Sequence, residues 1–209
     1  MNPTNSYMVP MVLERSSAGE RSFDLYSRLL RDRVIFVSDE VNQSIATLIC
    51  AQLLFLKSES NEPINMYVNS PGGCVISGLQ IVDTMDYVMG KIKSKSADIP
   101  VDPLVIKTYV LGQAASMGSV IASSGTKGHR YMLRHARNLM HSVSSGARGT
   151  VIDMKVAMNE SERLNELLTG IYVENTGQQY DKIKSDMSRD FFLDANQAVE
   201  YGLADEVIG

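Results

Sequence analysis

Short apolar runs alternate with segments of helical periodicity along most of this 209-residue chain, and this alternation constrains the fold more than any other feature. The strand-like runs are 34–37, 64–69, 104–111, 130–133 and 138–142. The segments with helical spacing of their apolar residues are 22–32, 41–57, 75–89 and 119–124. Strands that alternate with helices imply a mainly parallel sheet, so the pattern predicts an α/β fold.

Two segments do not fit a simple sheet. Residues 92–103 are polar and contain two prolines, which predicts a surface loop. Residues 150–175 contain no proline, and as one helix they would span about 39 Å at 1.5 Å per residue. A domain of this size does not easily cover such a length. Either the helix breaks near Gly170 and folds back, or it projects and packs on another subunit; we favour projection, and hence an oligomer.

Composition and charge argue against several classes of protein. Hydrophobic residues make up 44% and charged residues 21% of the chain, as in an ordinary globular domain. The net charge of −4 argues against a general nucleic-acid binder. No apolar run approaches the roughly 18 residues of a membrane span, and residues 1–7 lack the features of a secretory signal. Cys50 and Cys74 lie in apolar segments, which predicts buried thiols and a cytoplasmic protein.

Ser116 lies where a strand gives way to a helix. The apolar run before it is expected to end at Gly112, and helical character begins at Ser119. Small neighbours such as Ala114 and Gly118 leave the hydroxyl accessible, and the start of the helix supplies backbone N–H groups. This is the geometry that a serine nucleophile needs. On this segment alone a helix N-cap is the commoner role for such a serine, and both interpretations stay open at this point.

A serine nucleophile needs a base, and the chain has three histidines. His129 and His135 lie in segments typical of turns. His141 follows an apolar run and therefore stands at a strand end, where sites in open parallel sheets gather. It is the best candidate base, although the pattern fits a structural histidine as well. The acid cannot be selected from 24 carboxylates by pattern.

A second tight turn, Ser-Pro-Gly-Gly at 70–73, closes another predicted strand. Glycines allow backbone N–H groups to approach a ligand closely, and such groups can stabilise an oxyanion. An ordinary turn is the alternative interpretation.

Together, these motifs resemble the ClpP family, the proteolytic subunits of the Clp protease, from about residue 8 to the end of the chain. The matching pieces are 9–12, 19–24, 26–30, 69–73, 112–118 and 198–203. The resemblance implies a ClpP/crotonase-like α/β fold with a mainly parallel sheet and a projecting helical handle. It also implies an N-terminal axial segment over 1–20 and a peptidase domain over 21–209, with the handle at about 143–178.

The resemblance also implies roles for five residues. Ser116 matches the family nucleophile, and His141 matches the base 25 positions further on. Asp190 matches the acid that orients the base. The backbone N–H groups of Gly73 and Met117 match the oxyanion hole. No metal or organic cofactor is implied.

The implied function is a serine endopeptidase that cleaves unfolded polypeptides inside two stacked seven-membered rings of identical chains. A partner AAA+ ATPase would unfold and feed the substrates, and neither nucleic acid nor membrane is an expected partner. The positions that match the family's docking pockets for this ATPase are Tyr67, Tyr87, Tyr109, Leu111, Tyr131 and Ile208. Core or ring-interface packing is the alternative for these aromatic residues.

Two other functions remain open at this stage. One is a catalytically silent ring subunit, and the other is an acyl-CoA enzyme of the crotonase type, against which the three candidate catalytic residues argue. The chain departs from the family after His141, where Ser142-Val143 replaces the usual Gln-Pro. It also departs at 92–103, which is longer than the usual loop.

Overall fold

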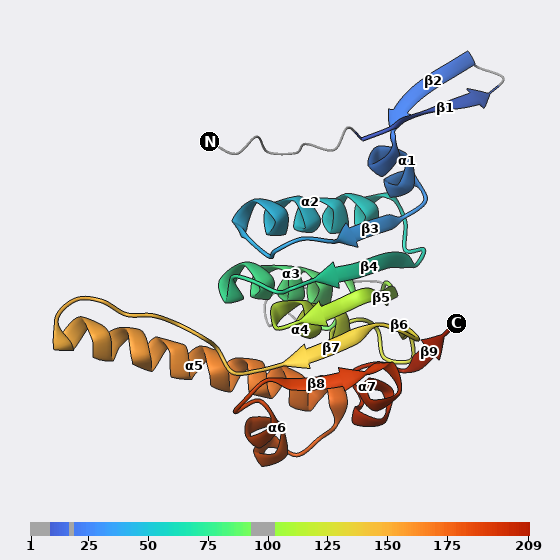
Figure 1. Cartoon of the computed structure of the whole chain (residues 1–209). Helices are drawn as coiled ribbons and strands as arrows, with labels where there is room; N and C mark the ends of the chain where they lie inside the picture. The colour runs from blue at the N-terminus through green and yellow to red at the C-terminus, as the bar shows by residue number, and fades with distance from the viewer. Residues whose placement is uncertain (1–8, 17–18, 93–102) are drawn as a thin grey trace.

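The computed structural model describes residues 9–16, 19–92 and 103–209, and a seven-stranded sheet organises the described part of the chain (Figure 1). Its strands are β3 (Val34–Val37), β4 (Ile64–Ser70), β5 (Ile106–Ala115), β6 (Arg130–Leu133), β7 (Arg137–Met140), β8 (Phe191–Asp194) and β9 (Glu206–Ile208). The order β3-β4-β5-β6-β9 is parallel throughout, and β7 pairs with β5 in parallel. Only the β7–β8 pair is antiparallel within this sheet. The predicted mainly parallel α/β sheet is therefore confirmed.

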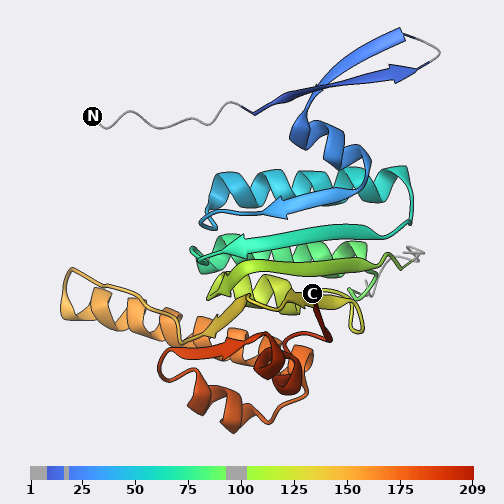
Figure 2. The ribbon, with the colours of Figure 1, turned by 45° about the vertical axis from the view of Figure 1, so that its right-hand side comes forward.

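Helices cover one face of this sheet. They are α2 (Gln43–Glu59), α3 (Val75–Val88) and α4 (Met117–Ser123), and both ribbon views show them on the same side (Figures 1 and 2). Along β4 the residues Ile64, Met66 and Val68 point into this layer and are fully buried. Their neighbours Asn65 and Tyr67 face the other way and are half-buried. The alternation follows from the period of two in a strand and puts the core between the sheet and the helices.

The segment 92–103 lies outside the described residues except at its two ends, so the loop prediction stays a prediction. The other predicted strands and helices, apart from the changes described below, are found to within two residues at each end. Among the helices of the described ranges, none combines the length and the apolar character that crossing a membrane requires.

The predicted helix over 22–32 is wrong in its first part. Residues 19–24 form β2 (Gly19–Asp24), which pairs with β1 (Met11–Ser16) in an antiparallel hairpin that extends away from the sheet (Figures 1 and 2). The helix α1 (Leu25–Arg31) begins only after Asp24, whose carboxylate accepts the backbone N–H of Ser27 at 2.9 Å. Aspartate is a preferred N-cap residue, so the helix starts there rather than at the first apolar position.

The strand β5 is longer than predicted, because Gly112 bends it instead of ending it. Gly112 has φ +74°, a conformation that glycine adopts at little cost. The pairing with β4 shifts register between Val68 and Ser70, beside this bend. As a result the first half of β5 pairs with β6 and the second half pairs with β7. The strand then continues to Ala115, directly before Ser116.

A single 26-residue helix, α5 (Val151–Thr176), accounts for the long segment without proline. Thr150 and Asp153 form a capping box at its start, and Gly177 ends it in the left-handed conformation. Gly170 does not break it. The first half carries apolar residues on an open surface, with Ile152 74% exposed, while the second half packs on the sheet layer. Both ribbon views show the first half projecting, which confirms projection over folding back (Figures 1 and 2).

Two shorter helices complete the chain, α6 (Tyr180–Asp186) and α7 (Ala195–Tyr201). They flank β8 in sequence and bring the chain back to β9 at the edge of the sheet.

Arg130 joins this edge of the sheet to the C-terminal end of α5. Its side chain is only 3% exposed, and its guanidinium donates to both carboxylate oxygens of Asp205 at 2.6 and 2.9 Å. It also donates to the backbone carbonyls of Ser123 and Asn175. Burial by itself raises the pKa of the Asp205 carboxyl, but Arg130 and the backbone N–H of Gly128 help hold that pKa below its ordinary value. One buried cation therefore connects β6, α4, α5 and the start of β9.

Replacing Arg130 with methionine should destabilise the chain, because Asp205 would keep a half-buried charge without its partner. We expect the free energy of unfolding to fall by about 3–5 kcal/mol in urea titrations at fixed protein concentration. Without Arg130, burial would raise the pKa of Asp205, whereas in the wild type that pKa is lowered, so the difference should be complete at neutral pH and should narrow as the pH falls through the acid range between these two pKa values.

The matched control for this prediction is Arg163→Met. Arg163 pairs with Glu160 on the surface of α5, where the two side chains are 60% and 51% exposed. Replacing Arg163 should lower the free energy of unfolding by less than about 1 kcal/mol. If the free energy of unfolding fell equally in the two variants, burial of Arg130 beside Asp205 would contribute nothing beyond a surface ion pair.

Candidate functional site

Ser116 occupies a strained turn between β5 and α4. Its backbone has φ 53° and ψ −122°, and Arg33 is the only other described non-glycine residue with a positive φ. Such a conformation is unfavourable for a residue with a side chain and is typical of functional turns. Ser116 stands at the cap position of α4, yet its side chain makes no capping hydrogen bond. The helix therefore does not use the hydroxyl, and α4 begins at Met117, two residues earlier than predicted.

The turn at Gly72 and Gly73 lies tightly against Ser116 and Val41. A side chain at Gly72 would come within 2.6 Å of the Ser116 Cβ, and one at Gly73 would overlap the carbonyl oxygen of Val41. Both glycines also have positive φ, so other residues would be strained as well as crowded. The sequence 70–73 is therefore more than an ordinary surface turn, because it fits against the candidate nucleophile.

A parallel bridge with Val41 orients the backbone of Gly73. The N–H of Val41 donates to the carbonyl of Gly72, and the carbonyl of Val41 accepts from the N–H of Cys74, both at 2.7 Å. In this pattern the N–H of the middle residue, Gly73, points away from Val41. Met117 is the first residue of α4, so its N–H has no acceptor inside the helix. These two backbone donors are available for a ligand next to Ser116.

A cavity of about 50 Å³ brings the candidate residues together. Ser116, His141 and Gly73 line it. The rest of its lining comes from Val75, Val120, Val143, Leu168 and Tyr172, with Ser142 and Ser144. The four segments involved are far apart in the sequence, and the carboxyl ends of β4, β5 and β7 bring them to one rim of the sheet (Figure 1).

Asp190 reaches His141 through the antiparallel pairing of β7 and β8. Met140 is opposite Phe191 in this pair, so the next position on each strand puts His141 opposite Asp190. The His141 Nδ1 and Asp190 Oδ1 atoms are 3.7 Å apart, which is an ion-pair distance and longer than a hydrogen bond. Asp190 is 63% exposed and faces a wider hollow of about 480 Å³ that His141 also lines. The β7–β8 register therefore places one carboxylate, the candidate acid Asp190, beside His141, which the residue pattern could not do.

The segment that follows His141 runs outward along α5. The N–H of Ser142 donates to the carbonyl of Met187 at 2.7 Å, and the N–H of Val143 donates to the Asn165 side chain at 3.1 Å. Proline has no N–H, so the usual Gln-Pro could not make the second of these bonds. In this chain the departure from the family pattern thus fastens the segment to the helix.

The other two histidines lie elsewhere. His129 precedes β6 and its Nδ1 is 3.5 Å from the Tyr131 hydroxyl. His135 accepts from the neighbouring Arg134 side chain in the turn before β7. Neither residue lines the cavity beside Ser116. Within the described residues, no group of three acidic, histidine or cysteine side chains lies close enough to hold a metal ion.

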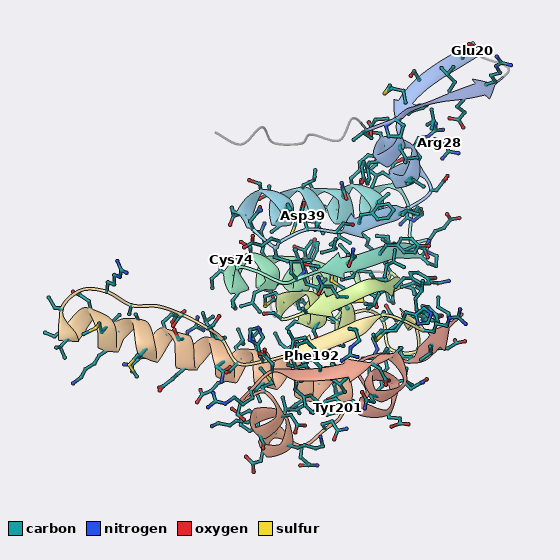
Figure 3. All side chains as sticks on the ribbon, viewed as in Figure 1. Glu20, Arg28, Asp39, Cys74, Phe192 and Tyr201 are labelled. Atoms are coloured by element: carbon teal, nitrogen blue, oxygen red, sulfur yellow. The ribbon has the colours of Figure 1, made fainter. Side chains whose placement is uncertain are left out.

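The prediction that both thiols are buried is wrong for Cys74. Cys50 is buried under α3, but Cys74 is exposed at the start of α3, next to Gly73 (Figure 3). The glycine turn puts Cys74 at the rim of the sheet rather than inside the helix layer. Hydrogen bonds from Ser77 lower the pKa of the Cys74 thiol, whereas burial raises the pKa of Cys50. Both cysteines are free, so no disulfide forms.

Three of the predicted docking residues form a stack of rings on the open face of the sheet. Tyr67, Tyr109 and Tyr131 lie opposite one another on β4, β5 and β6, with ring centroids 4.9 and 5.0 Å apart. Phe36 continues the stack on β3 at 5.6 Å from Tyr67. All three tyrosines are half-buried, so their rings are accessible from this face. We call these four rings the aromatic ladder.

The other three predicted docking residues are not part of the aromatic ladder. Leu111 and Ile208 are half-buried residues of β5 and β9. Tyr87 lies near the end of α3, is 44% exposed, and contributes no ring to the ladder. Of the four predicted docking tyrosines, the three on the sheet stack together, whereas Tyr87 lies on α3 in the helix layer.

The chain was compared with models of known protein families. The family model described as Clp protease matches residues 17–209, which includes every strand of the sheet, all of α5 and each candidate site residue.

Proposed function

The chain belongs to the Clp protease family, and from this premise we propose that it is a serine endopeptidase that cleaves unfolded polypeptides. The observation that carries the proposal is the strained turn at Ser116. Its hydroxyl is not used by the helix, and it shares a small cavity with His141 and with the N–H of Gly73. An acyl-CoA enzyme of the same fold has no need of a serine held in this way.

In the proposed reaction, the Ser116 Oγ attacks the carbonyl carbon of the scissile peptide bond. The Nδ1 of His141 faces Asp190, so its Nε2 takes the proton from Ser116 and later gives it to the leaving amine. Asp190 orients the imidazole and stabilises its charged form. Water then attacks the acyl-enzyme by the same route in reverse, which releases the second product and restores Ser116.

The negative oxygen of the tetrahedral intermediate would be held by the N–H groups of Gly73 and Met117. Both donors are backbone groups fixed before the substrate arrives, so they need no rearrangement when charge develops. The His141–Asp190 distance of 3.7 Å would shorten to a hydrogen bond when substrate or a neighbouring subunit orders the exposed aspartate.

The exposed half of α5 supports a ring assembly. Its apolar residues include Val151, Ile152, Val156 and Met158, all more than half exposed in the isolated chain. We propose that they pack on the matching helices of an opposed ring, so that two seven-membered rings of identical chains enclose the sites. Substrate would enter through the action of a partner AAA+ ATPase, and the protease chain itself would use no cofactor.

The aromatic ladder is our proposed docking surface for that ATPase. Tyrosine offers a large apolar body with a polar tip, which suits a pocket that binds a partner loop. Leu111 and Ile208 would extend the apolar surface, and Tyr87 would contribute from α3.

Replacing Ser116 with alanine should lower the cleavage rate of a small fluorogenic peptide by about 10⁴-fold or more, because no nucleophile remains. A fluorophosphonate should label the wild-type chain at Ser116 alone. The variant should keep its assembly, since only one hydroxyl is lost. Labelling at a different serine would refute the assignment, and a wild-type protein that cleaves nothing would favour the silent ring subunit.

Native mass spectrometry should find fourteen chains of 23.0 kDa, about 322 kDa in total. Ile152→Glu should convert this species into single rings of half the mass, because it puts charges into the proposed contact between rings. The matched control is Leu13→Glu, an equally drastic change of an exposed residue on the β1–β2 hairpin, which should leave the mass unchanged. A stable monomer in the wild type would contradict the proposed assembly.

The variants Tyr67→Ala and Tyr131→Ala should each lose ATPase-driven protein degradation, because each removes a ring from the docking surface. Both should keep the cleavage of small peptides and the mass of the assembly. Tyr180→Ala changes an exposed tyrosine of α6 outside the ladder and should retain both activities. If a ladder variant instead no longer forms the oligomeric assembly, that tyrosine stabilises the fold and does not bind the partner.

A further inference from the structure

The backbone carbonyl of Ser116 accepts hydrogen bonds from two directions. The N–H groups of Ser119 and Val120 donate to it from α4, at 2.9 and 3.2 Å. The hydroxyl of Tyr172 approaches the same oxygen from α5, at 3.5 Å, the outer limit of a hydrogen bond. Tyr172 thus joins the packed half of the long helix to the residue that carries the candidate nucleophile.

Tyr172 is a buried tyrosine that the proposed reaction does not use. It is 1% exposed, and Leu168, one turn earlier on the same helix face, lines the cavity beside Ser116 together with it. The Ser119 hydroxyl, which also interacts with Tyr172, donates to the Asn138 side chain at 2.8 Å. Burial raises the pKa of Tyr172, and Ser119 offsets part of the shift, so the hydroxyl stays protonated and can donate.

The orientation of this carbonyl determines the orientation of a catalytic donor. A peptide unit is planar and trans, so its C=O and its N–H point in opposite directions. The carbonyl of Ser116 and the N–H of Met117 belong to the same unit. Donors that hold the carbonyl back against α4 and α5 therefore direct the Met117 N–H toward the cavity.

We infer that Tyr172 is a positioning residue for the oxyanion hole, which acts by holding the Ser116 carbonyl so that the Met117 N–H faces the developing charge. The inference rests on the proposed peptidase function and adds a residue of the handle helix to it. Without the hydroxyl, the peptide unit keeps its two bonds inside α4 but loses the bond from the side of α5. Because the backbone of Ser116 is strained, the Ser116–Met117 peptide unit would rotate toward a less strained conformation once this bond is lost.

The test is Tyr172→Phe in the assembled protein, with the fluorogenic peptide as substrate. We expect kcat to fall about threefold to tenfold, as for the loss of one hydrogen bond, with KM changed by less than about twofold. The rate of inactivation by a fluorophosphonate should fall by a similar factor, because that reaction also develops charge on an oxygen in the hole. The mass of the assembly should not change.

Two further variants separate positioning from stability. Tyr201→Phe removes another buried tyrosine hydroxyl, one that donates to Asp186 and does not line the cavity, and it should leave kcat unchanged. Replacing Tyr172 with p-aminophenylalanine keeps the ring and a donor at its tip, and it should restore most of the lost kcat.

An unchanged kcat in Tyr172→Phe would overturn the inference, and so would equal losses in Tyr172→Phe and Tyr201→Phe. Failure of the amino variant to recover activity would also count against it. A wild-type protein that neither cleaves the peptide nor reacts with the fluorophosphonate would instead refute the proposed function itself, and this outcome is separate from the other three.

Discussion

The bend of β5 at Gly112 is the constraint on which the rest of the molecule depends. A side chain at this position would meet the Asn69 side chain at 2.9 Å, and the positive φ favours glycine. The bend lets one strand pair with β6 along its first half and with β7 along its second half. It also carries the chain to the rim of the sheet, where Ser116 and His141 line one cavity. In this member of the Clp protease family, the position of Ser116 therefore follows from the geometry of one strand.

Much of the fold could be predicted because its signals are local. Apolar runs such as 64–69 and helical spacing as in 75–89 identify elements whose side chains face one core, and the family match supports the ClpP-like sheet that they imply. The hairpin at the N-terminus was missed because β1 and β2 are half exposed and their apolar residues do not mark a core face. The burial of Cys74 was misjudged because a turn, not periodicity, decides where it lies.

The candidate site could be predicted only in part. Ser116 and the glycine turn are visible as small residues at strand ends, whereas Asp190 depends on the β7–β8 register, which no local pattern encodes. The contacts of α5 with the site could not be predicted either. Asn165 and Tyr172 lie on one face of the helix, but nothing in the sequence indicates their hydrogen bonds to Val143 and Ser116. Long-range pairing, and not residue type, limits what a sequence alone can tell about such a site.

The uneven anchoring of α5 has a consequence for the isolated subunit. Its C-terminal turns are clamped through Asn175 and Arg130, but its first three turns are supported only by the capping box at Thr150 and the segment beside them. A helical stretch of that length is only marginally stable in water without tertiary packing. Amide protons in these turns should exchange with solvent much faster than those near Tyr172, and in the proposed double ring this contrast should fade. Under the proposed assembly, the stability of the projecting half of α5 would come from the opposed subunit and not from its own domain.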